Sequence, residues 1–197
     1  MVGVLAVALG YVCGSLPTGL VAVRAFLGVD IRQHGSGNIG TVNVYRVAGP
    51  LLGALVLVAD GLKGAVPVWV AQRADLDAGW AVAAGLAAIV GHNWSVFLRF
   101  AGGKGIATSF GVVLALSAGV GAVAVAVWVA AVAVTRFASV GSILAMLSVP
   151  VAMLVLRKPV PYVVFGAIAA ALALYRHRSN IRRLIEGSEL RIGDRAQ

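Results

Sequence analysis

Charged residues and cysteine are scarce in this 197-residue chain. Only 12% of the residues are charged, against about 25% in a typical soluble domain. Asp and Glu together number seven, against sixteen Lys and Arg, and there is one cysteine. The low charge argues against a soluble globular protein. A single cysteine cannot form a bridge within the chain, so a disulfide-stabilised scaffold is excluded.

Hydrophobic residues make up 60% of the chain, which excludes a disordered protein. A membrane-spanning helix needs roughly 20 apolar residues, so this content suits about six spans, or seven short ones. We therefore predict an all-α, polytopic helical membrane protein with a single domain over residues 1–197. No Lys or Arg precedes Arg24, so the first apolar run is predicted to be a transmembrane helix and not a cleavable signal peptide. The predicted spans cover about 2–26, 50–71, 79–98, 105–117, 120–136, 138–156 and 160–175.

The apolar stretch 105–136 decides between six spans and seven. As one helix it would be about 48 Å long, against a hydrocarbon core of about 30 Å. Ser117, Gly119 and Gly121 are weak helix formers and predict a break. A break gives seven spans, whereas one long tilted helix gives six.

The distribution of Lys and Arg favours seven spans. If the basic tail is cytoplasmic, seven spans place the N-terminus outside and the C-terminus in the cytoplasm. Arg73, Arg157 and Lys158 then lie outside, and the positive-inside rule is satisfied. The net charge of +9 is thus explained by topology, by attraction of an anionic substrate, or by both, without a nucleic-acid partner. The twelve basic residues predicted to lie inside are Arg24, Arg32, Arg46, Arg99, Lys104, Arg136, Arg176, Arg178, Arg182, Arg183, Arg191 and Arg195.

The first predicted loop, residues 28–49, is rich in glycine and in small polar residues. Gly35, Gly37 and Gly40 have the G-x-G-x-x-G spacing of dinucleotide folds, but no βαβ unit fits between two spans. Glycines still let backbone N–H groups point at one anion. The stretch is therefore either an anion-binding loop or a flexible connection. Its side-chain donors are Ser36, Asn38, Thr41, Asn43 and Arg46, whose guanidinium suits phosphate.

The second predicted span contains Asp60-Gly61-Leu62-Lys63-Gly64, close to the middle of the bilayer. Asp60 and Lys63 are three residues apart, so they share a helix face and are predicted to pair. Gly61 and Gly64 would allow another helix to pack closely. The pair is predicted to be structural.

A second glycine-rich loop, Gly102-Gly103-Lys104-Gly105, lies between two predicted spans and is followed by Thr108. It is not a Walker A loop, because Leu98 stands where the first glycine would be and Gly105 follows the lysine. A glycine loop that carries a Lys and opens a helix can cradle a phosphate. The alternative is a tight hairpin with a topology-setting lysine.

Residues 176–183 (RHRSNIRR) lie where the last span meets the cytoplasm, and the polar tail from about 179 is predicted to begin as a short interfacial helix. His177 and Asn180 share a helix face there. The segment is either part of a site or a charged anchor. Under the seven-span topology both glycine-rich loops and this segment reach one face, which indicates a site for a phosphorylated ligand. No cofactor or metal is expected, since carboxylates are scarce and no Cys/His cluster is present.

With these residues assembled, the sequence resembles the bacterial acyl-phosphate:glycerol-3-phosphate acyltransferases, a family of small integral membrane enzymes. The resemblance rests on the stretches GSGNIGTVNVYRVAG, DGLKG, GHNWSVFLRFAGGKGIAT and RHRSNIRRLIEGSE. It implies acyl transfer from a fatty acyl phosphate, not acyl-CoA, to the 1-position of glycerol 3-phosphate. The product would be lysophosphatidate for phospholipid biosynthesis, made at the cytoplasmic face of the cell inner membrane. No protein partner is implied.

The resemblance also implies roles for individual residues. Ser36, His177 and Asn180 would be catalytic, and Glu186 a structural acidic residue. The implied substrate- and phosphate-binding residues are Gly37, Asn38, Gly40, Thr41, Asn43, Arg46, Gly102, Gly103, Lys104, Gly105, Thr108 and Ser142.

An acyl phosphate is an activated mixed anhydride, so the reaction needs two anion sites and correct orientation but no nucleotide. The base would be His177 or the phosphate of the donor itself. The His-x4-Asp motif of other glycerol-phosphate acyltransferases is absent. A small transporter of an organic phosphate is the alternative function, although the polar groups crowd one face and no internal repeat is visible.

Overall fold

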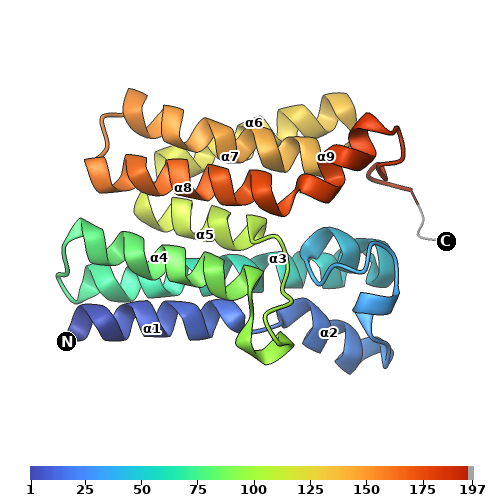
Figure 1. Ribbon diagram of the computed structural model, residues 1–197, viewed down its shortest axis with the longest axis horizontal. Coiled ribbons are helices and arrows are strands. Elements are labelled where there is room, and N and C mark those ends of the chain that lie inside the picture. The colour runs from blue at the N-terminus through green and yellow to red at the C-terminus, as the bar shows by residue number, and fades with distance from the viewer. Residues whose placement is uncertain (195–197) are drawn as a thin grey trace.

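The computed structural model describes residues 1–194, and Arg195, one of the predicted cytoplasmic arginines, lies outside the described residues. The described chain is helical throughout, with short connections (Figure 1). The helices are α1 (Val2–Ser15), α2 (Thr18–Leu27), η1 (Ile31–Gln33), α3 (Thr41–Arg73), α4 (Ala78–Asn93), η2 (Val96–Leu98), α5 (Ile106–Leu116), α6 (Ala118–Thr135), α7 (Ala138–Val155), α8 (Val160–Arg176) and α9 (Arg178–Ile185).

Five segments are long and apolar enough to cross a membrane: Val2–Leu27, Thr41–Arg73, Ala78–Leu98, Ala118–Thr135 and Ala138–Val155. A sixth is possible if α8 and α9, which meet at a bend of 56°, count as one span. Helix α5 is apolar but shorter. The prediction of an all-helical polytopic membrane protein is confirmed, and five to six candidate spans are established by length and composition.

The stretch 105–136 divides into two helices at the predicted place. Ser117 has an extended backbone, with φ −160° and ψ 105°, and separates α5 from α6. Gly121 lies so close to Leu114 that a side chain at this position would overlap it. The close approach lets α6 fold back beside α5, which excludes one long tilted helix.

Proline modifies the first two predicted spans. The first run is not one straight helix, because it breaks between α1 and α2 at Leu16-Pro17, where proline lacks an N–H and restricts the residue before it. Helix α3 begins at Thr41, well before the predicted start at 50, and is kinked at Gly49, which has a φ of 84° directly before Pro50. The polarity of residues 41–49 predicts a loop, and this prediction is wrong because these residues form the first turns of α3.

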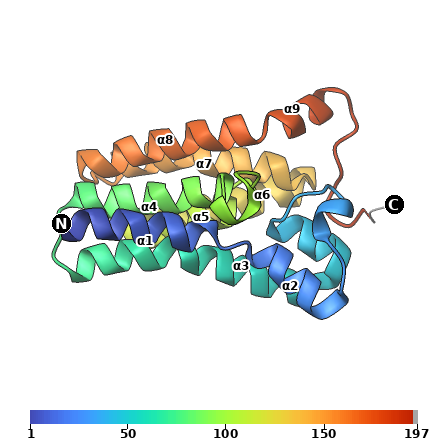
Figure 2. The same ribbon diagram turned by 60° about the horizontal axis from the view of Figure 1, so that its bottom comes forward.

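Two groups of helices pack side by side. Helix α1 lies against α4 and α3, while α6, α7 and α8 form a second layer, and α5 lies between the two groups (Figures 1 and 2). Gly64 faces the backbone of Thr108, and Gly111 that of Gly61, with no room for a side chain. The predicted close helix packing at Gly61 and Gly64 is thereby confirmed, with α5 as the partner.

The polar segments gather at one end of the bundle. The N-terminus and the turn between α3 and α4 lie at the opposite end from α2, η1, α9 and residues 186–194 (Figures 1 and 2). Helix α9 confirms a short helix in the polar tail. The arrangement places both glycine-rich loops and the tail near each other.

Candidate functional site

The first glycine-rich loop, residues 31–40, is organised around the side chain of Asn43. The Asn43 Oδ1 accepts a hydrogen bond of 2.8 Å from the Ser36 N–H. Its Nδ2 faces three carbonyl oxygens, at 2.8 Å for Asn38, 3.0 Å for His34 and 3.4 Å for Ile31. Asn43 is 2% exposed. The Asn43 amide thus shapes the loop from inside, and its hydrogen bonds give the loop a defined structure.

Ser36 is exposed at the tip of this loop, between two glycines in the left-handed region. Gly35 has a φ of 60° and Gly37 a φ of 68°. A side chain at Gly35 would overlap the Asn43 amide. The Asn38 Oδ1 accepts from the Gly40 N–H at 2.8 Å, so this amide too is used within the loop. The loop presents the Ser36 side chain outward.

Thr41 and Arg46 lie on the first turns of α3. The Thr41 hydroxyl and the Arg46 Nε are buried, and within the described chain they have no hydrogen-bond partner. The Arg46 Nη2 donates to the carbonyl oxygens of Leu190 at 3.1 Å and Arg191 at 3.5 Å. Arg46 therefore reaches the C-terminal segment with donor capacity to spare.

The backbone of the second glycine loop is held by hydrogen bonds from both helix groups. The N–H of Gly103 donates to the His92 carbonyl at 3.0 Å, and that of Gly102 to the Asn93 carbonyl at 3.2 Å. Arg176 at the end of α8 donates to the Gly103 carbonyl oxygen through Nη2 at 2.6 Å and Nε at 3.0 Å, and to the Gly102 carbonyl oxygen through Nη2 at 3.0 Å. Glycine at 102 and 103 leaves space for the α4 backbone and the His92 ring.

Lys104 follows this loop, and its side chain points to the third polar segment. The Lys104 Nζ donates to the Asn180 Oδ1 at 2.5 Å. Gly105, with a φ of 76°, then starts α5. Burial lowers the pKa of Lys104 to about 8; Glu189 opposes this, and nearby Arg183 adds to it. A lysine with this pKa is charged at neutral pH and loses its charge as the pH rises through the pKa.

His177 and Asn180 are both buried, at 3% and 5% exposure. The His177 Nδ1 lies 2.8 Å from the Ala173 carbonyl oxygen. A carbonyl only accepts, so Nδ1 carries the proton and, in the neutral ring, Nε2 is the acceptor. Asn180 is bonded on both sides, since its Nδ2 donates to the Glu189 Oε1 at 2.6 Å while its oxygen holds Lys104.

Glu189 is the partly buried acid of the cluster. It accepts from the Ser139 hydroxyl at 2.8 Å, from Asn180 and, through Oε2, from the Arg183 Nε at 2.7 Å. Burial would raise the pKa of Glu189, but the hydrogen bonds from Asn180, Ser139 and Arg183 outweigh it and hold the pKa below its usual value. Glu186 does not reach the cluster, because it pairs with Arg182 on the surface at 2.8 Å.

Ser142, Thr108 and the Asp60–Lys63 pair, which the sequence also singled out, have partners of their own. The Ser142 hydroxyl donates to the Ala138 carbonyl at 2.7 Å and accepts from Trp128 at 3.4 Å, between α6 and α7. Thr108 packs against Gly64 on α3. The predicted Asp60–Lys63 pair is confirmed at 2.9 Å and is buried inside the bundle.

Sequence reasoning missed Arg176, Ser139 and Glu189. Arg176 and Glu189 stand at the two ends of the stretch RHRSNIRRLIEGSE, but neither received a role in the predicted site, and Ser139 lies outside the quoted stretches. The one signal was the proximity of Glu189 to Glu186 in a carboxylate-poor chain. Within residues 1–194 no group of three or more His, Cys, Asp or Glu side chains could hold a metal ion.

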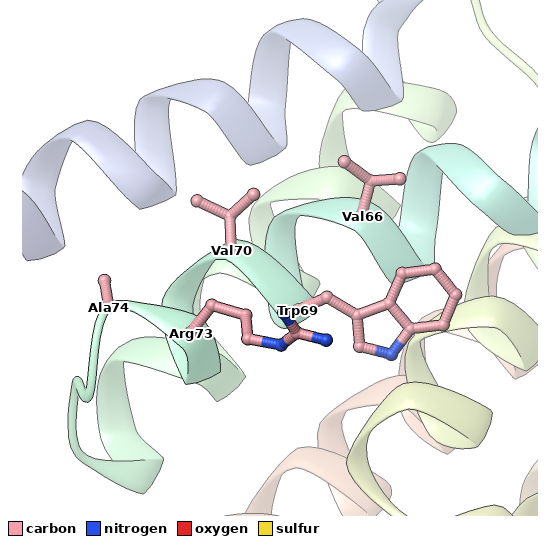
Figure 3. A pocket seen from close by; sticks show the side chains of 5 residues that line it. All are labelled: Val66, Trp69, Val70, Arg73 and Ala74. Atoms are coloured by element: carbon pink, nitrogen blue, oxygen red, sulfur yellow. The ribbon is translucent and has the colours of Figure 1, made fainter.

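A shallow apolar groove lies at the other end of α3, away from these polar residues. It is lined by Val66, Trp69, Val70, Arg73 and Ala74, and its side chains project from one helix (Figure 3). It offers hydrocarbon contacts and one guanidinium. The groove therefore lacks the clustered polar groups found at the other end of the bundle.

Comparisons with known proteins agree over nearly the whole chain. The sequence model of the glycerol-3-phosphate acyltransferase family matches residues 4–187. The glycerol-3-phosphate acyltransferase of Rubrobacter xylanophilus is 46% identical over 198 residues, covering 100% of this chain and 98% of the relative. That of Desulforudis audaxviator is 46% identical over 192 residues, covering 98% and 96%.

A solved structure is similar throughout as well. The crystal structure of PlsY (YgiH), an integral membrane glycerol 3-phosphate acyltransferase, in its glycerol 3-phosphate form, superimposes with a TM-score of 0.93 at 38% identity. The match covers 97% of this chain and 96% of that one. Since sequence and structure agree over almost every residue, this chain belongs to the glycerol-3-phosphate acyltransferase family of integral membrane enzymes.

Proposed function

We propose that this protein transfers a fatty acyl group from an acyl phosphate to the 1-hydroxyl of glycerol 3-phosphate, giving lysophosphatidate and inorganic phosphate. The family supplies the acceptor and the acyl transfer; the donor and the position are the proposal. The observation that carries it is the meeting of Lys104 with Asn180 at one end of the bundle. Arg46 from α3 reaches the same C-terminal segment that supplies Glu189.

Two cations on separate elements support a reaction in which both substrates carry phosphate. Arg46 offers a planar guanidinium with unused donors, and Lys104 a compact ammonium. The Lys104–Asn180 hydrogen bond would open when a substrate phosphate takes the ammonium, freeing the Asn180 oxygen to orient a hydroxyl. Each cation would hold one phosphate, so that the hydroxyl and the acyl carbon meet at bonding distance.

The chemistry is direct acyl transfer. The oxygen of the 1-hydroxyl attacks the acyl carbon, and the bond between that carbon and the phosphate oxygen breaks as phosphate leaves. The hydroxyl proton passes to the departing phosphate or to the Nε2 of His177, which its Nδ1 contact leaves as the acceptor. Ser36 and the backbone N–H groups of the glycine loops would donate to the oxygen on which charge develops.

We further propose a seven-span topology in the bacterial inner membrane, with the N-terminus outside and the site facing the cytoplasm. In it α5 crosses as a short seventh span, and the break at Ser117 lies near the outer surface. The proposal is supported by the basic residues at the end of the bundle that carries α9 and both loops (Figure 2).

The test is a donor comparison with purified protein in detergent. Palmitoyl phosphate with glycerol 3-phosphate is expected to release phosphate and to yield 1-acyl product, while palmitoyl-CoA yields none. Lys104→Ala and Arg46→Ala should each remove most turnover. Equal use of the thioester, 2-acyl product, or wild-type turnover in both variants would contradict the proposal.

A further inference from the structure

A group of polar side chains lies inside the bundle, separate from the residues that meet at Lys104. Asp60 is 1% exposed and pairs with Lys63 at 2.9 Å. The hydroxyl of Thr18 also donates to the Asp60 Oδ1, and the Nδ1 of His92 lies 3.8 Å from the same oxygen. The ion pair already balances the charge of Asp60. The contacts to α2 and α4 therefore call for a separate reason.

One contact leads from Asp60 to the first glycine-rich loop. Thr18 is the first residue of α2, directly after the break at Pro17. The neighbouring Lys63 donates to the Leu16 carbonyl at the same break, at 2.8 Å. Gly19, next to Thr18, lies against the carbonyl oxygen of Ile39 with no room for a side chain. The start of α2 is thus fixed by α3 and supports the end of the 31–40 loop.

The other contact leads to the second glycine loop. His92 lies on the last turn of α4 and is 4% exposed. Its Nε2 faces Gly103 so closely that a side chain there would overlap the ring. Its carbonyl also accepts from the Gly103 N–H at 3.0 Å. The orientation of the His92 ring therefore bears on the residue directly before Lys104.

We propose that Asp60 is a positioning residue that sets the spacing between the 31–40 loop and the 102–105 loop, acting through Thr18 and His92. The inference rests on the proposed function, in which the two loops serve the two phosphorylated substrates. Asp60 pairs with Lys63, accepts from the Thr18 hydroxyl and lies 3.8 Å from the His92 ring, so it is a point common to α2, α3 and α4. A shift of about 1 Å between two substrate sites can cost about a hundredfold in rate, so a shared anchor has value for catalysis.

The kinetic test removes each contact without removing the ion pair. Thr18→Val keeps the side-chain shape and loses the hydroxyl; His92→Phe keeps a ring against Gly103 and loses the nitrogen near Asp60. Each is expected to raise the KM of at least one substrate about tenfold, with a smaller change in kcat. Thr18→Ser, which keeps the hydroxyl, should restore wild-type values. Ser148→Ala is the matched control, because its hydroxyl serves only the Ala145 carbonyl within α7.

A distance measurement provides a readout that does not depend on activity. Spin labels are placed at Gln33 and Ala101, which are exposed in the two loops, in a Cys13→Ala background. Thr18→Val and His92→Phe should broaden the distance distribution, while Thr18→Ser and Ser148→Ala should match the wild type. The two variants alter different neighbours of Asp60, so one that fails to fold leaves the other as a test.

The outcomes separate the two proposals. Unchanged distances together with unchanged KM values in a folded Thr18→Val or His92→Phe protein would overturn the positioning role. Lower thermal stability with wild-type KM and distances would also overturn it, since Asp60 would then serve packing alone. Broadened distances in a protein whose wild type transfers no acyl group would support the positioning role and refute the proposed function.

Discussion

Lys104 and Asn180 are 76 positions apart, yet the Lys104 ammonium donates a hydrogen bond of 2.5 Å to the Asn180 Oδ1. The bond joins the glycine loop before α5 to the helix after α8. The same Asn180 donates to Glu189, so a lysine, an amide and a carboxylate form one continuous chain. In the proposed reaction these hydrogen bonds hold the Lys104 ammonium, which binds a substrate phosphate, in place before the substrate arrives.

The first prediction concerns the lysine. Lys104→Met should reduce kcat/KM for glycerol 3-phosphate by about 10²–10³, as expected when a charged donor to a developing or bound anion is lost. Lys104→Arg keeps the charge and should lose less. Steady-state kinetics of purified proteins give the comparison, and equal losses in the two variants would show that the charge is not what matters.

The second prediction concerns pH. Because the pKa of Lys104 is lowered to about 8, its ammonium is charged below that pH and neutral above it. A site that needs the cation should therefore bind phosphate well at pH 7 and lose affinity as the pH rises through about 8. The pH profile of kcat/KM reports the free enzyme. In Lys104→Arg the decrease of kcat/KM at alkaline pH should move to higher pH. An unchanged profile would show that the decrease is due to the titration of another group.

The third prediction compares two carboxylates. Glu189→Gln should destabilise the protein by about 1–3 kcal/mol, because Arg183 loses its ionic partner and the new amide cannot accept as well from Asn180 and Ser139. Glu186→Gln is the matched control. It removes only an exposed pair with Arg182 and should change stability by less than about 1 kcal/mol. Thermal unfolding in detergent measures both, and similar losses would contradict the distinction.

The fourth prediction concerns Asn43. Asn43→Asp keeps the oxygen that accepts from Ser36 but cannot donate to the carbonyls of Asn38 and His34. The 31–40 loop should then open, with faster hydrogen exchange and lower turnover. In Ser36→Ala only turnover should fall, since the Ser36 side chain is exposed. If the 31–40 loop of Asn43→Asp exchanged its backbone hydrogens at the wild-type rate, Asn43 would have no role in shaping the loop.

The fifth prediction concerns topology. In a Cys13→Ala background, Ala74→Cys and Lys158→Cys should react with a membrane-impermeant maleimide in intact cells, while Gln33→Cys should react only after lysis. A topology in which only one of α5 and α6 crosses would place residue 158 on the same side as residue 33. Protection of Lys158→Cys would therefore rule out seven spans.

Features that depend on neighbours in sequence were predictable. The apolar runs predict the helices, because a backbone in lipid must satisfy its hydrogen bonds within a helix. Weak helix formers at 117–121 predicted the break that Ser117 makes. The Asp60–Lys63 pair followed from a spacing of one helical turn. In contrast, the early start of α3 was missed because the polar composition of 41–49 is also that of a loop.

The site itself shows the limit of sequence reasoning. The motifs identified Lys104, His177 and Asn180 as candidates. They did not predict that Lys104 contacts Asn180, or that Glu189 and not Glu186 is the carboxylate that Asn180 binds. Arg176 was visible only as a positive charge, although its guanidinium holds the carbonyls of the glycine loop. Ser142, in turn, is engaged within α6 and α7.

The sequence alone determined that the chain is a helical membrane protein with glycine-rich polar segments between its apolar runs. Hydrophobic length and local spacing act within one helical turn or one span, so they can be read along the chain. Only the tertiary structure decided which carboxylate reaches Asn180 and how Asp60 joins α2, α3 and α4. Those contacts depend on where Pro17 bends the chain and how closely the glycines let the helices approach, and no periodic pattern encodes either.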